Sequence, residues 1–340
     1  MKERSVFVDN AKGLGILLVI IGHLVPRDSY TFIYIFAFHM PLFFLISGYL
    51  LNPKKFENFS DCVKYSYKHY IKPYIAFCII GFVISLPVNL GGVIIGKHDA
   101  FEVLSKMLYM VFWEVWPFCF FMGSIWFLVV LFFAVIWGWL ILTCIQNRYR
   151  CFVIFLLPCV SYMLFLLQKA SFMPSFVQES LPFRFASVPI STMFILMGYE
   201  LKIHNVVIKF SYVSIIALVF SAVCIPLNGY VNISTPQFNN LLLYVVNAVA
   251  GSYVIFSLSG YKWPNFIGWI GKNSLIIFAM HSVWITIYSV LIAYMLGFQS
   301  IYTMRMPLLY GLIGAIVVAA LSMPTIKVIQ PILNFIIKKL

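Results

Sequence analysis

The sequence predicts an all-α membrane protein, a polytopic transmembrane helical bundle of about ten spans with both termini in the cytoplasm. Of its 340 residues, 63% are hydrophobic and only 10% are charged, and the mean hydropathy is +0.98. A soluble fold of this length cannot bury so much apolar surface. Apolar runs long enough to cross a bilayer extend through most of the chain. We therefore expect residues 1–340 to form a single membrane-embedded domain without a separate soluble domain.

Ten apolar runs define the expected spans, and the basic residues between them define the orientation. The runs lie at residues 11–27, 31–51, 73–95, 122–145, 151–169, 186–201, 210–228, 241–259, 273–296 and 307–328. With the N-terminus in the cytoplasm, six basic residues fall on the outer side, namely Arg27, Lys97, Lys106, Lys169, Arg184 and Arg305. The other 17 of the 23 Lys and Arg residues then lie on the cytoplasmic side, as the positive-inside rule requires.

Two connecting segments have a mixed character. Residues 103–121 are apolar enough to cross, but they contain Lys106, Glu114 and Pro117, and a crossing there would invert the charge bias of every later loop. We interpret them as an interfacial or re-entrant element on the outer side. Residues 52–72 mix apolar and aromatic residues with five lysines. This pattern is typical of an amphipathic segment on the cytoplasmic surface, or of a plain anchor to anionic lipids.

The charged residues and the cysteines exclude several other classes of protein. The net charge is +13, but the basic residues are spread among the loops and form no tract, so we expect a lipid bilayer and no nucleic acid as a partner. The seven cysteines mostly lie within apolar runs and show no CxxC spacing. We therefore interpret them as packing residues and expect no metal site.

The first apolar run, KGLGILLVIIGH, contains two polar residues at its ends, Lys12 and His23. Eleven residue steps at about 100° place both on one helix face, about 16 Å apart along the axis. Ionisable groups within a membrane helix are costly in lipid and usually face protein or water. The stretch therefore fits either a functional pair or a snorkelling lysine with a helix-packing histidine.

Three later spans also contain polar residues where lipid penalises them. The second span holds His39 and Ser47, the fourth begins near Trp126, and the ninth carries Lys272, Asn273, Ser274 and His281. From the predicted topology and a rise of about 1.5 Å per residue, we expect three histidines near mid-depth. Lys12 and Lys272 should then lie at the cytoplasmic mouth and Trp126 near the outer face. The pattern favours a polar passage through the membrane.

These residue types suit group transfer. Histidine exchanges a proton near neutral pH, so it can act as a general base toward an attacking hydroxyl. Lysines at the cytoplasmic mouth can pair with a phosphate-bearing donor. Each residue also has an ordinary structural interpretation, such as an interhelical hydrogen bond or an interfacial aromatic belt. The coincidence of four such stretches favours function.

At these positions the sequence resembles the acyltransferase family 3 of integral membrane O-acyltransferases. The family has a basic residue and a histidine with ten residues between them on the first helix, here Lys12 and His23, preceded by Asp9 and Asn10. The later stretches FHMPLFFLISGY, SIWFL and GKNSLIIFAMH also resemble the family pattern, and the match covers about the whole chain. The compact form looks most like the branch of fucose O-acetylases and enterobacterial-antigen acetyltransferases.

The resemblance implies transfer of an acyl group, usually acetyl from acetyl-CoA, to a hydroxyl of a surface-polysaccharide, lipopolysaccharide O-antigen or lipid-linked sugar. It implies that His23 is the catalytic base or proton carrier and that Lys12 orients the donor. His39, Ser47 and Trp126 would be pocket residues, with Lys272, Asn273, Ser274 and His281 as further substrate-binding candidates. Relatives often carry arginine at the position of Lys12, and lysine lacks the bidentate fork of arginine. No bound cofactor is implied, because acetyl-CoA is a substrate.

Two alternatives from other classes remain open at this point. A transporter or flippase for a lipid-linked glycan also needs polar groups within the membrane, although the sequence shows no internal repeat. A glycosyltransferase or polymerase that uses a lipid-linked glycan usually carries paired acids or a large outer loop, which this sequence lacks. The resemblance suggests a multi-pass protein of a bacterial inner membrane. It leaves open homo-oligomer formation, the acceptor sugar and the leaflet in which the acceptor lies.

Overall fold

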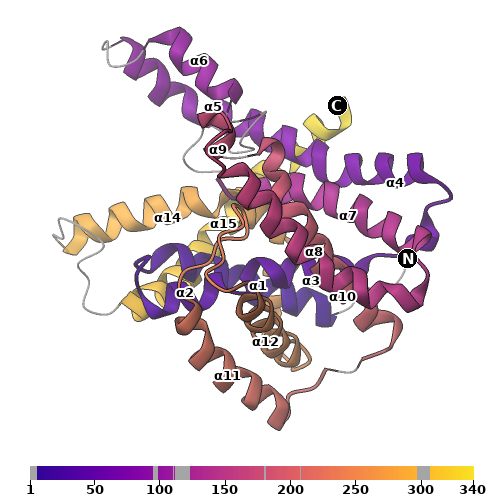
Figure 1. Cartoon of the computed structure of the whole chain (residues 1–340). Coiled ribbons are helices and arrows are strands. Elements are labelled where there is room, and N and C mark those ends of the chain that lie inside the picture. Colours follow the sequence, from indigo (N-terminus) through magenta and orange to yellow (C-terminus); the bar gives the residue numbers. More distant parts are fainter. Residues whose placement is uncertain are drawn as a thin grey trace. The chain divides into compact units, whose positions relative to one another are not determined.

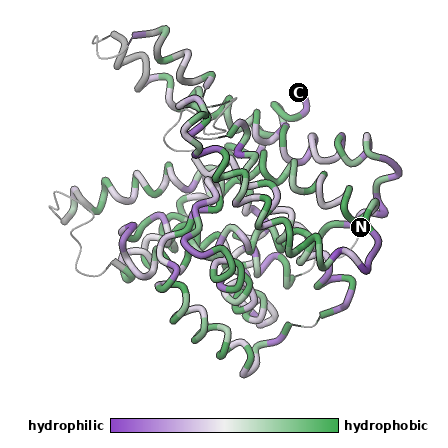
Figure 2. Tube along the Cα trace, in the orientation of Figure 1, coloured by the Kyte–Doolittle hydropathy of each residue, from purple (hydrophilic) through white to green (hydrophobic). Residues whose placement is uncertain are grey.

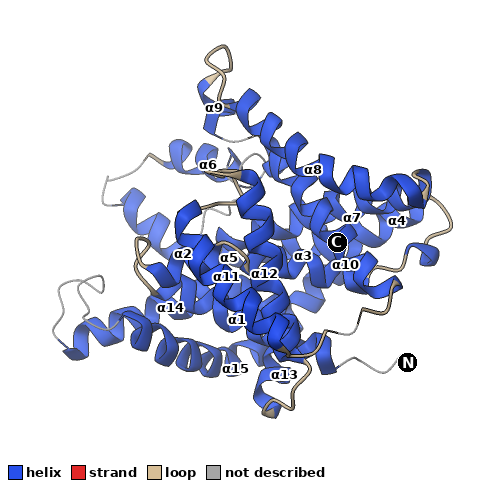
Figure 3. Cartoon of the chain, turned by 60° about the horizontal axis from the view of Figure 1, so that its bottom comes forward, coloured by secondary structure: helices blue, strands red, loops and turns tan. Residues whose placement is uncertain are grey.

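The computed structural model describes residues 6–94, 99–109, 111, 123–179, 181–206, 208–296 and 307–340 (Figure 1). In these ranges the only β-structure is an isolated bridge between Asn232 and Gln237, and helices joined by loops make up the rest (Figure 3). The α-helices are α1 (Val6–Leu24), α2 (Tyr30–Phe36), α3 (His39–Leu50), α4 (Phe59–Ser66), α5 (Lys72–Ile94), α6 (Ala100–Tyr109), α7 (Trp126–Cys144), α8 (Asn147–Gln168), α9 (Ser175–Glu179), α10 (Val188–Ile203), α11 (Tyr212–Asn228), α12 (Leu241–Ser259), α13 (Asn265–Lys272), α14 (Ser274–Leu296) and α15 (Pro307–Lys339).

The helices confirm the predicted all-α polytopic bundle. Nine segments of the described chain are long and apolar enough to cross a membrane, and the 17-residue helix α11 is a shorter apolar helix. Each of these ten segments corresponds to one of the predicted spans. Hydrophobic residues follow the helices, and hydrophilic residues gather in several connecting segments (Figure 2). The chain is therefore an integral, multi-pass membrane protein.

Many large apolar side chains on these helices are exposed, as a lipid environment requires. Phe155 and Met163 on α8 are 77% and 62% exposed, and Tyr294 on α14 is 87% exposed. In water, such surfaces would promote aggregation. In a bilayer they face acyl chains, which are as apolar as the side chains themselves.

The first helix begins earlier than the sequence predicts. It starts at Val6, so that Asp9 and Asn10 lie inside it, each 3% exposed. The Asn10 amide donates to the carbonyls of Ser259 and Tyr261, at 3.1 and 3.3 Å. These distant carbonyls satisfy the Asn10 amide inside the helix. From the local sequence alone, Asn10 would mark the end of the apolar run.

The described chain divides into two compact units. Unit 1 comprises residues 1–51, 194–233 and 237–327, and unit 2 comprises residues 52–193, 234–236 and 328–340. In unit 1, helix α1 is central and contacts α2, α3, α12, α13 and α14. Figures 1 and 3 both show α1 beside α12. Glycines also allow α3 to touch the part of α10 that belongs to this unit, since a Cβ on Gly48 of α3 or on Gly198 of α10 would overlap a backbone carbonyl of the other helix.

In unit 2, helix α7 is central and contacts α4, α5 and α8. The predicted amphipathic segment at residues 52–72 forms a 3₁₀ turn (Pro53–Lys55), then α4, then a π-helical turn (Tyr67–Ile71) that continues into α5. Cys62 and Ser66 on α4 are buried, whereas Lys64 and Lys68 are exposed. The Lys55 ammonium lies 4.3 Å from the centre of the Tyr65 ring. The segment is thus helical over most of its length, with an exposed basic face.

The ambiguous stretch at residues 103–121 lies largely outside the described residues. Its first part belongs to α6, which has 10 residues and is too short to cross a bilayer. The interfacial or re-entrant interpretation of the whole stretch stays a prediction.

Candidate functional site

Lys12 and His23 lie on one continuous helix, as the sequence predicts. Both belong to α1, whose regular geometry places them on one face about 16 Å apart. Because α1 runs from Val6 to Leu24, Lys12 lies in its second turn and His23 lies in its last turn, one residue before the end of the helix. Lys12 is half-buried and His23 is exposed. His23 therefore lies nearer the C-terminal end of its helix than the predicted span of residues 11–27 places it, because α1 ends at Leu24.

Unit 1 brings the three predicted histidines together. The ring centres of His23 on α1 and His281 on α14 are 5.0 Å apart. Phe36 joins His39 to this pair, because its ring centre lies 5.6 Å from that of His23 and 4.7 Å from that of His39. His39 is 4% exposed and His281 is 1% exposed. Within this histidine cluster (His23, His39 and His281), only His23 lines one of the two pockets described below.

Hydrogen bonds to the backbone define the orientation of the two buried histidines. The Nδ1 atom of His39 lies 2.9 Å from the Ile35 carbonyl oxygen, and that of His281 lies 2.6 Å from the Phe278 carbonyl oxygen. Because a carbonyl can only accept, Nδ1 must carry the proton in each neutral ring. Each Nε2 atom then presents a lone pair, and that of His281 lies 3.5 Å from the Ser282 hydroxyl.

His23 opens into a pocket of about 340 Å³, here called the His23 pocket. Its lining comes from the end of α1, the following turn, α2 and α14. The lining residues are Gly22, His23, Leu24, Val25, Arg27, Phe32, Ile285, Thr286, Ser289 and Val290. The pocket thus has mostly apolar walls with one imidazole, one guanidinium and two hydroxyls, as expected for a small-ligand site.

A second pocket, of about 380 Å³, lies near the start of α1 and is here called the Lys272 pocket. It is lined by Val6, Asp9, Asn10, Trp263, Pro264, Asn265, Gly268, Trp269 and Lys272. Among these only Lys272 is a predicted site residue. One signal in the sequence points to two of the others, because Asp9 and Asn10 precede the Lys12–His23 pair in an otherwise apolar stretch.

Helices α1 and α13, which both line the Lys272 pocket, pack closely through their backbones. A Cβ on Gly13 of α1 would overlap the Ile267 carbonyl of α13, and a Cβ on Gly271 of α13 would overlap the Asp9 carbonyl of α1. Small residues let membrane helices approach in this way. The Trp263 indole donates to the Leu258 carbonyl at 2.8 Å, which holds the chain that enters α13.

The other predicted substrate-binding residues occupy structural positions. Ser47 is half-buried and donates to the Phe43 carbonyl of its own helix at 2.8 Å. Asn273 separates α13 from α14, and its side-chain amide donates to the Trp269 carbonyl at 2.9 Å. Ser274 is the half-buried first residue of α14. Trp126 begins α7, is 6% exposed and belongs to unit 2, whereas the histidine cluster belongs to unit 1.

Metal ligation finds no support in the described ranges. There, no group of three or more His, Cys, Asp or Glu side chains has a geometry that could hold a metal ion. The three histidines gather through ring packing, and two of them use Nδ1 for backbone carbonyls.

Comparison with known proteins identifies the family. The family model for the acyltransferase domain of acyltransferase family 3 matches residues 5–327. Searches of curated proteins and of solved structures found no significant match. The family model covers both pockets and the histidine cluster, and it favours group transfer over the transporter and polymerase alternatives. The chain belongs to acyltransferase family 3 and is a membrane acyltransferase.

Proposed function

We propose that this protein transfers an acetyl group from cytosolic acetyl-CoA to a hydroxyl of a surface-polysaccharide or lipid-linked sugar, with His23 as the general base. One observation carries the proposal. His23 is the only exposed residue of the histidine cluster, and it lines a pocket large enough for a sugar ring. A general base must reach the proton that it removes, and His39 and His281 are buried.

The reaction follows from these groups. His23 takes the proton of the acceptor hydroxyl as its oxygen attacks the thioester carbonyl carbon. The new C–O bond forms, the C–S bond breaks, and the leaving thiolate takes the proton from the His23 imidazolium. Protons and electron pairs therefore balance without a further reactant. Direct transfer uses His23 first as a base and then as an acid.

His281 supports this role as a positioning residue. Its ring lies beside that of His23 and is itself fixed by the Phe278 carbonyl. Its Nε2 lone pair can accept an N–H of His23 when that ring turns toward it, which would leave the other His23 nitrogen for the acceptor hydroxyl. His39 contacts the same Phe36 ring as His23, which links it to the other two histidines.

The donor is assigned to the other end of α1. In acetyl-CoA the pantetheine arm separates the thioester from the nucleotide phosphates, so one molecule can occupy groups that lie apart along a helix. Lys272 lines the Lys272 pocket and supplies a cation for the phosphates of the donor. Trp263 and Trp269 offer ring surfaces for stacking of its adenine ring. Lys12, one turn along α1 from Asp9, would orient the donor between this pocket and His23.

The cellular setting follows from the family resemblance and from the charge bias. We assign the protein to a bacterial inner membrane, with the donor pocket facing the cytoplasm. The Lys272 pocket lies beside segments that the positive-inside rule assigns to the cytoplasm, whereas Arg27 at the His23 pocket falls on the outer side. This orientation suits an acceptor that is exported or presented at the outer leaflet.

A transfer assay tests the proposal. Purified protein in nanodiscs is incubated with acetyl-CoA radiolabelled in the acetyl group and with extracted lipid-linked glycans. Heat-denatured protein serves as the control. We expect label in the glycan fraction that survives chromatography and is released by mild alkali, as an O-acetyl ester is. Absence of transfer, together with absence of acetyl-CoA binding, would contradict the proposal.

A further inference from the structure

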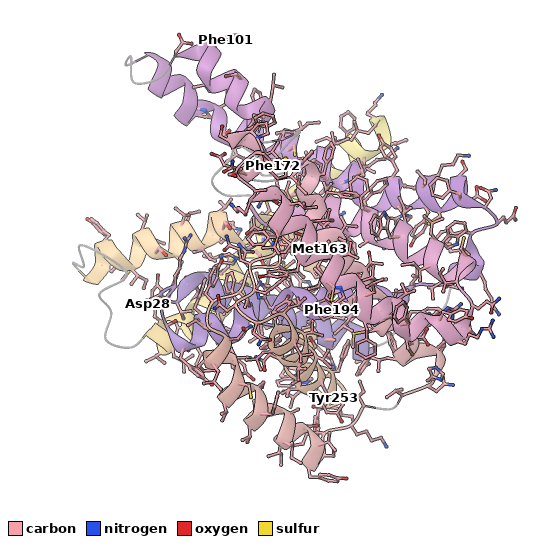
Figure 4. All side chains as sticks on the ribbon, in the orientation of Figure 1. Asp28, Phe101, Met163, Phe172, Phe194 and Tyr253 are labelled. Carbon is pink, nitrogen blue, oxygen red and sulfur yellow. The ribbon has the colours of Figure 1, made fainter. Side chains whose placement is uncertain are left out.

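The turn between α1 and α2 fixes a cation at the His23 pocket. Ser29 caps α2 by accepting from the Phe32 amide at 3.2 Å, and its hydroxyl donates to the Pro26 carbonyl at 2.6 Å. The Ser29 amide also donates to that carbonyl, at 3.0 Å. These bonds close the turn around Arg27 and Asp28. Figure 4 labels Asp28, which marks the position of this turn.

Arg27 lines the His23 pocket four residues after His23 itself. The other polar groups in the lining are the hydroxyls of Thr286 and Ser289. None of the described residues that line the pocket carries a carboxylate. Asp28, the nearest acid along the chain, is exposed, and no ion pair within the described ranges joins it to Arg27. The pocket therefore has a net positive character beside its candidate base.

The aromatic ring of Tyr230 lies near Arg27. Tyr230, 41% exposed, packs on Phe32 and Phe36 with ring centres 5.7 and 6.2 Å apart. Burial raises the pKa of the Tyr230 phenol, and the neighbouring charge of Arg27 opposes that rise. Arg27 thus lies close to Tyr230 as well as to the pocket. A ring surface beside a cation is a suitable contact for a sugar that carries an anionic group.

We infer that Arg27 binds an oxyanion of the acceptor, so that the acceptor is an anionic carbohydrate with a carboxylate or phosphate near the hydroxyl that is acylated. The guanidinium matches such groups through two parallel N–H donors and stays charged at every physiological pH. This inference rests on the proposed function, because it treats the His23 pocket as the acceptor site. It adds the class of acceptor and the residue that selects it.

Ligand protection of a cysteine tests the inference without requiring acyl transfer. Val290 is a pocket-lining residue that is 61% exposed, so Val290→Cys gives a thiol at the pocket. Alkylation of this introduced thiol by a neutral maleimide is followed by mass spectrometry in detergent, with the exposed native Cys151 as an internal reference. The probes are methyl glucuronoside, glucose 1-phosphate and the neutral methyl glucoside.

We expect at least one anionic sugar to protect the introduced thiol at concentrations roughly 10- to 100-fold below those needed for methyl glucoside. Stronger protection by glucuronoside indicates a carboxylate source, and stronger protection by the sugar phosphate indicates a phosphate source. Arg27→Gln should abolish the preference, and Arg27→Lys should retain part of it. Asp28→Asn, a charge change in the same turn, should retain it fully.

Three outcomes would overturn the inference: equal protection by charged and neutral sugars, protection by none of them, or a preference that persists in Arg27→Gln. The result is distinguishable from failure of the proposed function. If the protein transfers no acetyl group but shows Arg27-dependent protection, the acyl-transfer proposal fails and the anion site stands. If transfer occurs and protection ignores charge, the anion site fails and the acyl-transfer proposal stands.

Discussion

The two pockets of unit 1 lie toward opposite ends of α1 and are built differently. At the Lys272 pocket, glycines bring the backbones of α1 and α13 into contact, and Asn10 is fixed by two distant carbonyls. At the His23 pocket, the ionisable groups are the exposed side chains of His23 and Arg27, on a helix end and a turn. The first pocket lies between two helices whose backbones touch, and the second carries its ionisable groups on exposed side chains.

This difference suggests that one end of α1 serves donor binding and the other end serves the reaction. Closely packed helices with internally bonded polar groups, as at the Lys272 pocket, suit binding of the donor. The donor is the same in every round of acyl transfer. An accessible imidazole with a charged neighbour suits the reaction and the choice of acceptor. Because both ends belong to one helix, its regular rise fixes the separation between binding and chemistry.

The largest effect is expected from the histidine cluster. His281→Phe keeps a buried ring but removes the Nε2 lone pair beside His23, so we expect transfer to fall roughly 10- to 100-fold while the donor KM is unchanged. His69→Phe is the matched control, since His69 is exposed and lies in unit 2. Steady-state kinetics and the melting temperature are measured for both. If His281→Phe weakened donor binding as much as it slowed transfer, the proposed separation of donor binding from chemistry would be wrong.

The next effect concerns the glycine contacts of the Lys272 pocket. Gly271→Ala places a methyl group against the Asp9 carbonyl, so we expect a loss of about 1–3 kcal/mol of stability and weaker donor binding. Gly268→Ala is the control for stability, because the nearest atom to its added Cβ is the Asn10 side-chain oxygen at 3.7 Å. Thermal unfolding in detergent compares the two. Equal melting temperatures would show that the helix crossing tolerates the methyl group.

Lys12 tests whether the face shared with His23 contacts the donor. Lys12→Ala should raise the donor KM roughly tenfold, because it removes a cation that would pair with a donor group. Lys12→Arg should keep activity, since it preserves the charge. The same donor affinity in all three proteins would show that Lys12 does not bind the donor.

The smallest effect is expected at Lys272, which is exposed and therefore screened by solvent. Lys272→Gln should raise the donor KM only about two- to fivefold, and the increase should shrink with added salt. Lys262→Gln serves as the control, because Lys262 is also exposed but does not line the pocket. If both variants behave alike, the effect comes from general surface charge and not from the pocket.

Most of the fold can be predicted from the sequence, because a bilayer demands about 20 apolar residues for each helical span. The ends of the spans are harder to predict. Helix α1 can extend back through Asp9 and Asn10 because the Asn10 side chain has hydrogen-bond partners there. Those partners lie about 250 residues further along the chain. Local composition contains no information on such partners.

The site is predictable where its spacing lies within one helix. Lys12 and His23 share a face because eleven steps make slightly more than three turns. His281 follows from the family pattern, and the structure adds its contact with His23. Arg27, Trp263 and Trp269 are not predicted as site residues, since a turn or a second helix brings them to the pockets. Asn273 is a predicted substrate-binding residue. In the structure its side-chain amide donates a hydrogen bond to the Trp269 carbonyl, a partner that the sequence does not reveal.

The central claim is that binding of the donor and chemistry are separated along α1, and His23→Ala tests it most directly. We would measure in one preparation the dissociation constant for acetyl-CoA and the rate of acetyl transfer. The separation predicts a dissociation constant within about twofold of wild type and a transfer rate lower by roughly 10²–10⁴-fold. Transfer at the wild-type rate, or loss of acetyl-CoA binding together with transfer, would contradict it.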